Sequence, residues 1–167
     1  KYMIRAGVLG AAGYGGGELL RLLAMHPDAE VTLLGGHSAA GKNILASSPH
    51  LRGYYDMIVS DTNYEQLKET CDVVFLALPH GLAVDIATEL VPAGVKVIDL
   101  GSDFRFHDTS VYEAWYKVEH HNPDLAKQAV YGLPELWRQE VKNASLIANP
   151  GCYPTSIILG LYPLLKE

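Results

Sequence analysis

Short apolar runs alternate along this chain with segments in which leucine, isoleucine and alanine recur at helical spacing. The apolar runs, which are typical of strands in a parallel sheet, occupy residues 6–9, 30–34, 72–78, 95–100 and 146–148. The helical spacing predicts helices at residues 16–25 and 81–91. Pro154, which suits a first helical position, predicts a helix at residues 154–165, and we also predict a short helix at residues 64–70. Strands and helices that alternate with short connections indicate βαβ units. We therefore predict an α/β fold, a Rossmann-like doubly wound parallel sheet with helices on both faces.

Two stretches lack a clear periodicity. Residues 35–52 contain many glycine, serine and histidine residues, and residues 101–134 form a long connection rich in aromatic side chains. We therefore assign no strand or helix to residues 35–52, and we interpret residues 101–134 as a connection.

A glycine loop joins the first predicted strand to the first predicted helix. In this loop Gly10, Gly13 and Gly16 follow a GxxGxxG spacing. A pyrophosphate can approach the backbone closely at such a loop and accept hydrogen bonds from the amides of the helix N-terminus. Strand, glycine loop and helix in this order predict a dinucleotide site, and a tight turn without a ligand is the alternative.

The end of the second predicted strand indicates which dinucleotide is bound. An NAD site usually places a carboxylate about 20 residues beyond the glycines, where it holds the ribose hydroxyls. No acidic residue occurs from Val31 to Tyr55, whereas Ser38 and Lys42 follow the strand and could hold a 2′-phosphate. We therefore predict NADP(H) as the cofactor, with a solvated loop as the alternative role of Ser38 and Lys42.

The two cysteines lie in different settings. Cys152 stands between the last predicted strand and a helix, where the free amides and the dipole of the helix N-terminus favour a thiolate. A thiolate beside a nicotinamide can accept an acyl group as a thioester, which a hydride then reduces to an aldehyde. Cys71 precedes a core strand without turn residues around it, so we predict it to be a small buried side chain.

Composition and charge exclude several classes of protein. The 167 residues, 49% of them apolar, suffice for one globular core. The net charge of -6 disfavours a nucleic-acid partner, and two cysteines without CxxC spacing disfavour a disulfide framework and a metal site. The apolar run within residues 1–10 is too short for the apolar region of a signal peptide or for a membrane span, so we expect a cytoplasmic protein without a membrane partner.

Five motifs occupy residues 10–19, 78–81, 99–105, 131–135 and 149–155. Together they resemble the family of N-acetyl-gamma-glutamyl-phosphate reductases. The motifs occur in the family's order and cover nearly the whole chain. Those at 99–105 and 149–155 separate this family from the related aspartate-semialdehyde dehydrogenases.

The resemblance implies an NADP-dependent oxidoreductase of arginine biosynthesis. Such an enzyme reduces N-acetyl-L-glutamyl 5-phosphate to N-acetyl-L-glutamate 5-semialdehyde and phosphate, with Cys152 matching the nucleophile that forms the thioester. The expected partner is this small acyl-phosphate substrate, and the full-length enzyme is expected to be a homo-oligomer. The nearest alternative is a reductase of lysine biosynthesis that acts on an aminoadipyl phosphate.

Candidate site residues follow from the motifs and the loops together. The expected cofactor contacts are Gly10, Ala11, Gly13, Tyr14, Gly15, Gly16, Ser38, Lys42 and Pro79. Arg105 and Asn149 are the expected substrate contacts, because a planar guanidinium suits an acyl phosphate or a carboxylate. A salt bridge from Arg105 to Asp99 or Asp103 is an equal alternative. His80 is expected to contact the cofactor or brace its loop rather than act as a general base.

The chain departs from the family in its length. We predict that residues 1–150 form the NADP-binding domain and that residues 151–167 form the cysteine turn and the start of a helix leading to a substrate and dimerisation domain. The chain ends at Glu167, so we expect a fragment without that second domain and its catalytic histidine. An NADP-binding module without turnover of its own is the alternative function.

Overall fold

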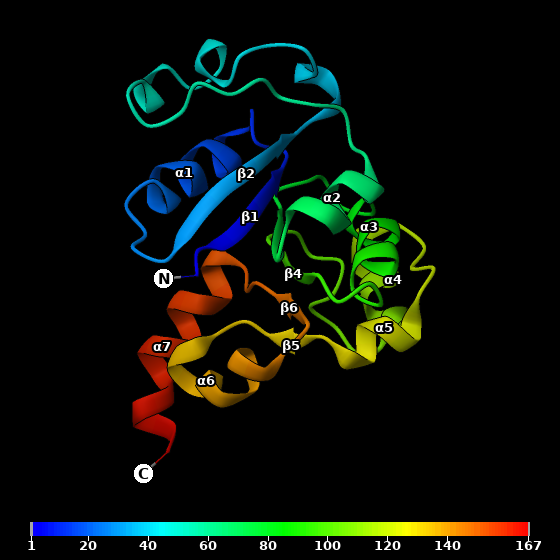
Figure 1. Cartoon of the computed structure of the whole chain (residues 1–167). Coiled ribbons are helices and arrows are strands. Elements are labelled where there is room, and N and C mark those ends of the chain that lie inside the picture. Colours follow the sequence, from blue (N-terminus) through cyan, green and yellow to red (C-terminus); the bar gives the residue numbers. More distant parts are fainter. Residues whose placement is uncertain (1, 167) are drawn as a thin grey trace.

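The central sheet has 6 strands, all parallel, in the order β2-β1-β3-β4-β6-β5 (Figure 1). The strands are β1 (Ile4–Leu9), β2 (Ala29–Gly35), β3 (Val73–Leu76), β4 (Lys96–Asp99), β5 (Val130–Tyr131) and β6 (Leu146–Ala148). This computed structural model describes residues 2–166. The sheet grows outward from β1 in both directions, with β2 on one side and β3, β4, β6 and β5 on the other. This order confirms the predicted doubly wound sheet.

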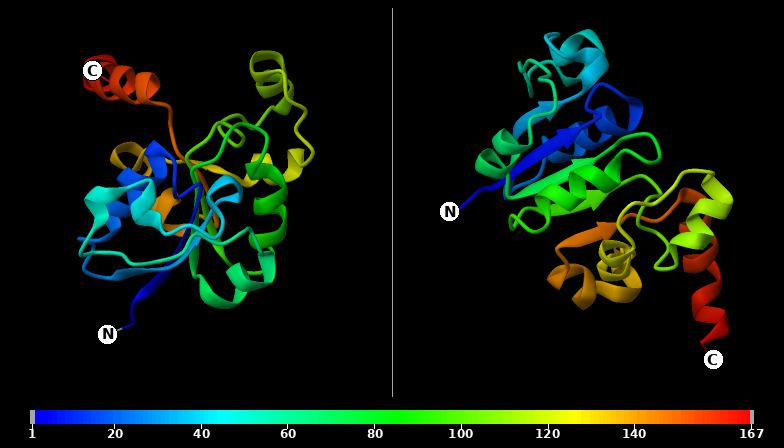
Figure 2. Two further views of the ribbon diagram at one scale, coloured as in Figure 1. Left: turned by 90° about the horizontal axis from the view of Figure 1, so that it is seen from above. Right: turned by 90° about the vertical axis from the view of Figure 1, so that its right-hand side faces the viewer.

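Helices cover both faces of the sheet (Figure 2). The α-helices are α1 (Tyr14–Leu23), α2 (Tyr64–Thr70), α3 (Ala83–Leu90), α4 (Thr109–Tyr116), α5 (Pro123–Gln128), α6 (Pro134–Asn143) and α7 (Cys152–Leu165). The core forms two clusters, one with α1 and the other with α2, α3 and α5. Neighbouring residues of β1 point into different clusters, since Val8 belongs to the first and Leu9 to the second. A strand buried on both faces therefore reads as one continuous apolar run.

Regular structure within the two stretches without periodicity corrects the sequence prediction. The first stretch contains three short 3-10 helices, η1 (His37–Ala39), η2 (Ile44–Ala46) and η3 (Pro49–Leu51). The second contains α4, α5 and β5. Side chains cap the N-termini of α4 and α5. Asp108 accepts a hydrogen bond from the Ser110 amide, and Asn122 accepts one from the Leu125 amide. These capping residues were the feature of the sequence that could have indicated α4 and α5. The strand β5 has only 2 residues, which is too short to show a hydrophobic period.

The last helix extends away from the sheet (Figure 2). No residue of α7 is buried, and Tyr153, Ile157, Leu164 and Leu165 are all exposed apolar side chains on it. Within residues 2–166, no helix combines the length and the apolar character needed to cross a membrane.

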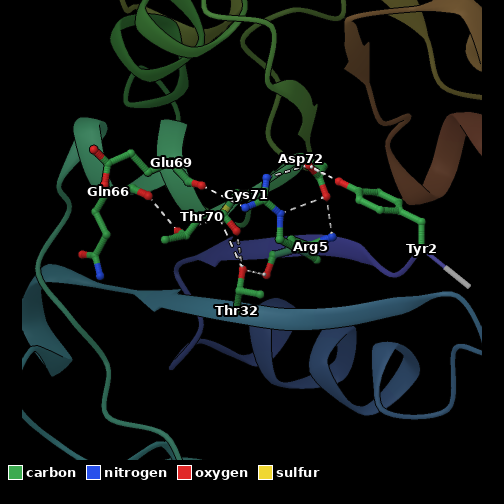
Figure 3. Close-up of polar contacts among 9 residues, drawn as sticks. Tyr2, Arg5, Thr32, Gln66, Glu69, Thr70, Cys71 and Asp72 are labelled. Carbon is green, nitrogen blue, oxygen red and sulfur yellow. Dashed lines mark hydrogen bonds and ion pairs between the residues drawn. The ribbon is translucent and has the colours of Figure 1, made fainter.

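A polar cluster fastens the amino-terminal ends of β1 and β3 (Figure 3). Asp72 accepts hydrogen bonds from the Arg5 amide and guanidinium, each at 2.8 Å, and from the Tyr2 hydroxyl at 2.9 Å. The Arg5 guanidinium holds the pKa of Asp72 well below its usual range. Cys71, beside this cluster, is buried with its Sγ 3.6 Å from Thr32 Oγ1, which confirms its prediction as a buried side chain.

Candidate cofactor and cysteine site

The glycine loop lies at the carboxyl ends of β1 and β3, where the sheet reverses its winding. Gly10 has a φ of +80°, and a Cβ on it would lie 2.1 Å from the Ala77 carbonyl oxygen. The amides of Gly10 and Ala11 donate to the Gly35 carbonyl at 2.8 and 3.2 Å, which ties the loop to the end of β2. Only glycine fits at position 10, because the backbone ending β3 passes so close.

The start of α1 is open to an anion. Its N-cap residue is Gly13, no side chain caps the helix, and its first turn has no acidic residue. A Cβ on Gly16 would lie 2.3 Å from the Gly10 carbonyl oxygen, so the turn itself requires this glycine. A Cβ on Gly15 would meet no atom within 4 Å, and Tyr14 is fully exposed. A tight turn alone is enough to require glycine at positions 10 and 16. The free amides at the N-terminus of α1 are in addition suited to bind a pyrophosphate.

The end of β2 carries the residues predicted to select the dinucleotide. Ser38 in η1 and Lys42 are exposed, and neither side chain has a polar partner in the part of the chain that the structure describes. An acid is nonetheless close by, because Asp61 Oδ1 lies 3.2 Å from His37 Nδ1. The hydrogen bond from His37 lowers the pKa of Asp61. Sequence reasoning missed Asp61, since a bridge between Gly35 and Ser60 returns a distant segment to this strand end.

The turn after β3 contains Pro79, which is exposed, and is held by the loop after β4. Both carboxylate oxygens of the buried Asp103 accept a hydrogen bond from the Gly81 amide, at 3.0 and 2.9 Å. His80 Nδ1 lies 2.7 Å from the Ser102 hydroxyl oxygen. These contacts give His80 a bracing role in its loop.

Cys152 is exposed and is the first residue of α7. The helix N-terminus has no side-chain cap and no acidic residue in its first turn, so its field favours an anion at this position. A pocket of about 560 Å³ adjoins the thiol. Its lining residues are Gly132, Leu133, Pro134, Glu135, Asn149, Pro150, Cys152, Thr155 and Ser156.

Arg105 braces the loop that leads to this cysteine. Its Nε donates to the Asn149 carbonyl at 2.9 Å and its Nη2 to the Leu100 carbonyl at 3.1 Å. Neither of the expected salt bridges is present in residues 2–166, because backbone carbonyls rather than Asp99 or Asp103 receive the guanidinium. Arg105 thus joins the loops that follow β4 and β6.

Asp99 lies beside this brace and is fully buried. Its Oδ1 accepts a hydrogen bond from the Gly101 amide at 2.8 Å, while Oδ2 has no partner among the described residues. Burial raises the pKa of Asp99 to about 7, against the opposing effect of the Gly101 amide. The sequence placed Asp99 at the end of a strand, in the motif at residues 99–105 and as a possible partner of Arg105, but its buried environment arises from packing that no local pattern shows.

The glycine loop and Cys152 lie on the same edge of the sheet. Each follows the carboxyl end of a parallel strand, β1 and β6 respectively, and the order of the sheet places β3 and β4 between them. A dinucleotide that begins at the glycine loop can therefore extend along this edge toward the thiol. Among the described residues no group of acidic, histidine or cysteine side chains could hold a metal ion.

Comparison with known proteins finds a matching family and relatives that resemble nearly the whole chain. Residues 5–144 match the family described as semialdehyde dehydrogenase, NAD binding domain. An N-acetyl-gamma-glutamyl-phosphate reductase of Moorella thermoacetica is 49% identical over 164 residues, covering 98% of this chain and 47% of that protein. The protein of the same name from Desulforamulus reducens is 52% identical over 165 residues, covering 99% of this chain and 48% of its own length.

Solved structures show the same fold. Aspartate semialdehyde dehydrogenase of Candida albicans, determined with NADP, has a TM-score of 0.70 and 24% identity, covering 98% of this chain and 47% of its own. Aspartate semialdehyde dehydrogenase II of Vibrio cholerae also has a TM-score of 0.70, at 20% identity, covering 99% and 47%. This chain spans about half the length of the curated relatives that it matches.

Proposed function

Because the chain belongs to the semialdehyde dehydrogenase NAD-binding domain family, we propose that it is the cofactor-binding part of an NADP-dependent N-acetyl-gamma-glutamyl-phosphate reductase. The observation that carries the proposal is an exposed cysteine at an uncapped helix N-terminus, on the edge of the sheet that holds the glycine loop. The names of the relatives favour an acetylglutamyl phosphate over an aminoadipyl phosphate as substrate.

The residues around the glycine loop fit a dinucleotide. The free amides at the start of α1 would hold the pyrophosphate, and Ser38 with Lys42 would hold the 2′-phosphate. Pro79 would lie against the cofactor on the other side of the switch point. Bound NADPH would supply the hydride that converts a cysteine thioester to an aldehyde and frees the thiolate.

Cys152 would begin the chemistry. Its thiolate attacks the acyl carbonyl carbon, the carbon–oxygen bond to phosphate breaks, and phosphate leaves with the electron pair, so that a thioester remains on Cys152. Backbone amides of the first turn of α7 are placed to stabilise the oxyanion of the attacked carbonyl. Arg105 and Asn149 are the proposed substrate contacts, and Arg105 also fixes the loop that carries the thiol.

A second candidate function applies to these 167 residues alone. Among the described residues that line the pocket beside Cys152 there is no histidine, the side chain that most often carries out proton transfers in catalysis. We propose that residues 1–150 bind NADP(H), that residues 151–167 lead to further structure, and that the chain by itself binds the cofactor without turnover. A cytoplasmic location and a homo-oligomeric enzyme stay predictions.

A titration with NADPH and NADH, followed by fluorescence, tests the cofactor. We expect tighter binding of NADPH, and we expect the double variant Ser38→Ala, Lys42→Ala to weaken NADPH binding by roughly tenfold with little effect on NADH. Lys142→Ala is the control, because Lys142 is an exposed lysine of α6. A preference of the wild-type chain for NADH would overturn the assignment of Ser38 and Lys42.

A further inference from the structure

A pocket of about 370 Å³ adjoins the first turn of α1 on the side of the segment between β2 and α2. Its lining residues are Ala12, Gly13, Tyr14, Gly17, Ser47, Ser48 and His50. The segment runs beside α1 (Figure 1), where Ile44 and Leu51 share a core cluster with Leu20 of the helix. The wall carrying the two serines and the histidine therefore has a fixed position relative to the helix.

Ser48 is the unusual member of this wall. It is 4% exposed, and its hydroxyl has no hydrogen-bond partner within residues 2–166. A Cβ on Gly17 would lie 2.8 Å from Ser48 Oγ, so a glycine at position 17 allows the hydroxyl to lie against the helix. The polar groups of buried residues normally have partners, and Ser48 lines a pocket that can admit a partner for its hydroxyl.

The charges around the pocket favour an anion. The start of α1 supplies free amides and has no acidic residue in its first turn. His50 is exposed on the opposite wall. The next acid along α1, Glu18, is already paired with Arg21, with 2.6 Å between Oε1 and Nη2.

We propose that this pocket is part of the pyrophosphate site. The start of α1 forms one wall, and on the other wall the Ser48 hydroxyl donates to a phosphate oxygen and His50 adds a further donor. The inference rests on the proposed function and adds Ser48 and His50 to the cofactor contacts. The pyrophosphate is preferred over the 2′-phosphate because the pocket shares the first turn of α1, whereas Ser38 and Lys42 lie at the end of β2.

Dissociation constants of NADPH and NADH for three single variants test the proposal. Ser48→Ala should weaken both dinucleotides by the same factor, roughly tenfold, since both contain the pyrophosphate. Ser47→Ala is the matched control, because Ser47 lines the same pocket but already donates its hydroxyl hydrogen to the Ile44 carbonyl at 3.1 Å. His50→Gln should weaken both dinucleotides by up to about fivefold, and its exposed position leaves folding intact.

Each other outcome counts against the proposal. A loss confined to NADPH would place the 2′-phosphate here, and unchanged binding by Ser48→Ala would remove Ser48 from the site while the proposed function stands. Should Ser48→Ala not fold, unchanged binding of both dinucleotides by His50→Gln overturns the proposal. Wild-type chain that binds neither dinucleotide would instead contradict the proposed function itself.

Discussion

Asp99 shows at the scale of one residue how packing changes chemistry. Its carboxyl group is fully buried at the end of β4, and burial raises its pKa to about 7. In the unfolded chain an aspartic acid has a pKa of about 4. Between these values the folded chain keeps a proton that the unfolded chain has lost, so Asp99 lowers the stability progressively as the pH rises from about 4 to 7.

Asp99→Asn should remove this pH dependence while keeping an acceptor for the Gly101 amide. The free energy of unfolding of the variant minus that of the wild type should rise between pH 4 and 7, by at most about 4 kcal/mol. Urea unfolding followed by circular dichroism at several pH values measures this difference. Asp124→Asn, at an exposed position, is the control, and parallel curves for Asp99→Asn and wild type would refute the effect.

At the scale of elements, Asp103 joins two helices and one turn. Its carboxylate accepts hydrogen bonds from the Gly81 and Ala83 amides and from the Tyr112 hydroxyl at 2.9 Å. It thereby serves the start of α3, which has no cap from its own N-cap residue Leu82. The same contacts join α4 to the turn that carries Pro79.

Asp103→Asn should therefore destabilise the fold, because an amide group cannot accept from all these donors with its nitrogen. We expect a loss of about 2–3 kcal/mol in the free energy of unfolding. Asp108→Asn is the matched control, since Asp108 caps α4 at an exposed position where asparagine caps equally well. Chemical unfolding of both variants measures the effect, and equal stabilities would show that the Asp103 contacts contribute little.

At the scale of the whole molecule, local sequence patterns predicted most strands, but they did not predict which strands pair with each other. The continuous apolar runs located β1, β2, β3, β4 and β6, and the short helix predicted at residues 64–70 agrees fully with α2. The edge position of β5 beyond β6 depends on a crossover that no local pattern specifies. A short strand without its own hydrophobic period cannot be recognised before its partner is known.

The candidate site divides in the same way. The glycine loop and the cysteine turn were predicted because each depends on residues adjacent in sequence. Asp61 and Ser48 were not, because folding of the segment between β2 and α2 brings them to β2 and α1. The bracing role of Arg105 also needed the structure, since its acceptors are backbone carbonyls.

The central claim, that Cys152 is the poised nucleophile of this edge of the sheet, is tested most directly by alkylation. The native chain is treated briefly with iodoacetamide, and the modified positions are identified by mass spectrometry, with Cys152→Ser as the control. We predict that Cys152, exposed at a helix N-terminus, is modified well before the buried Cys71, and that the variant shows little early modification. Modification of Cys71 before Cys152 would contradict the account.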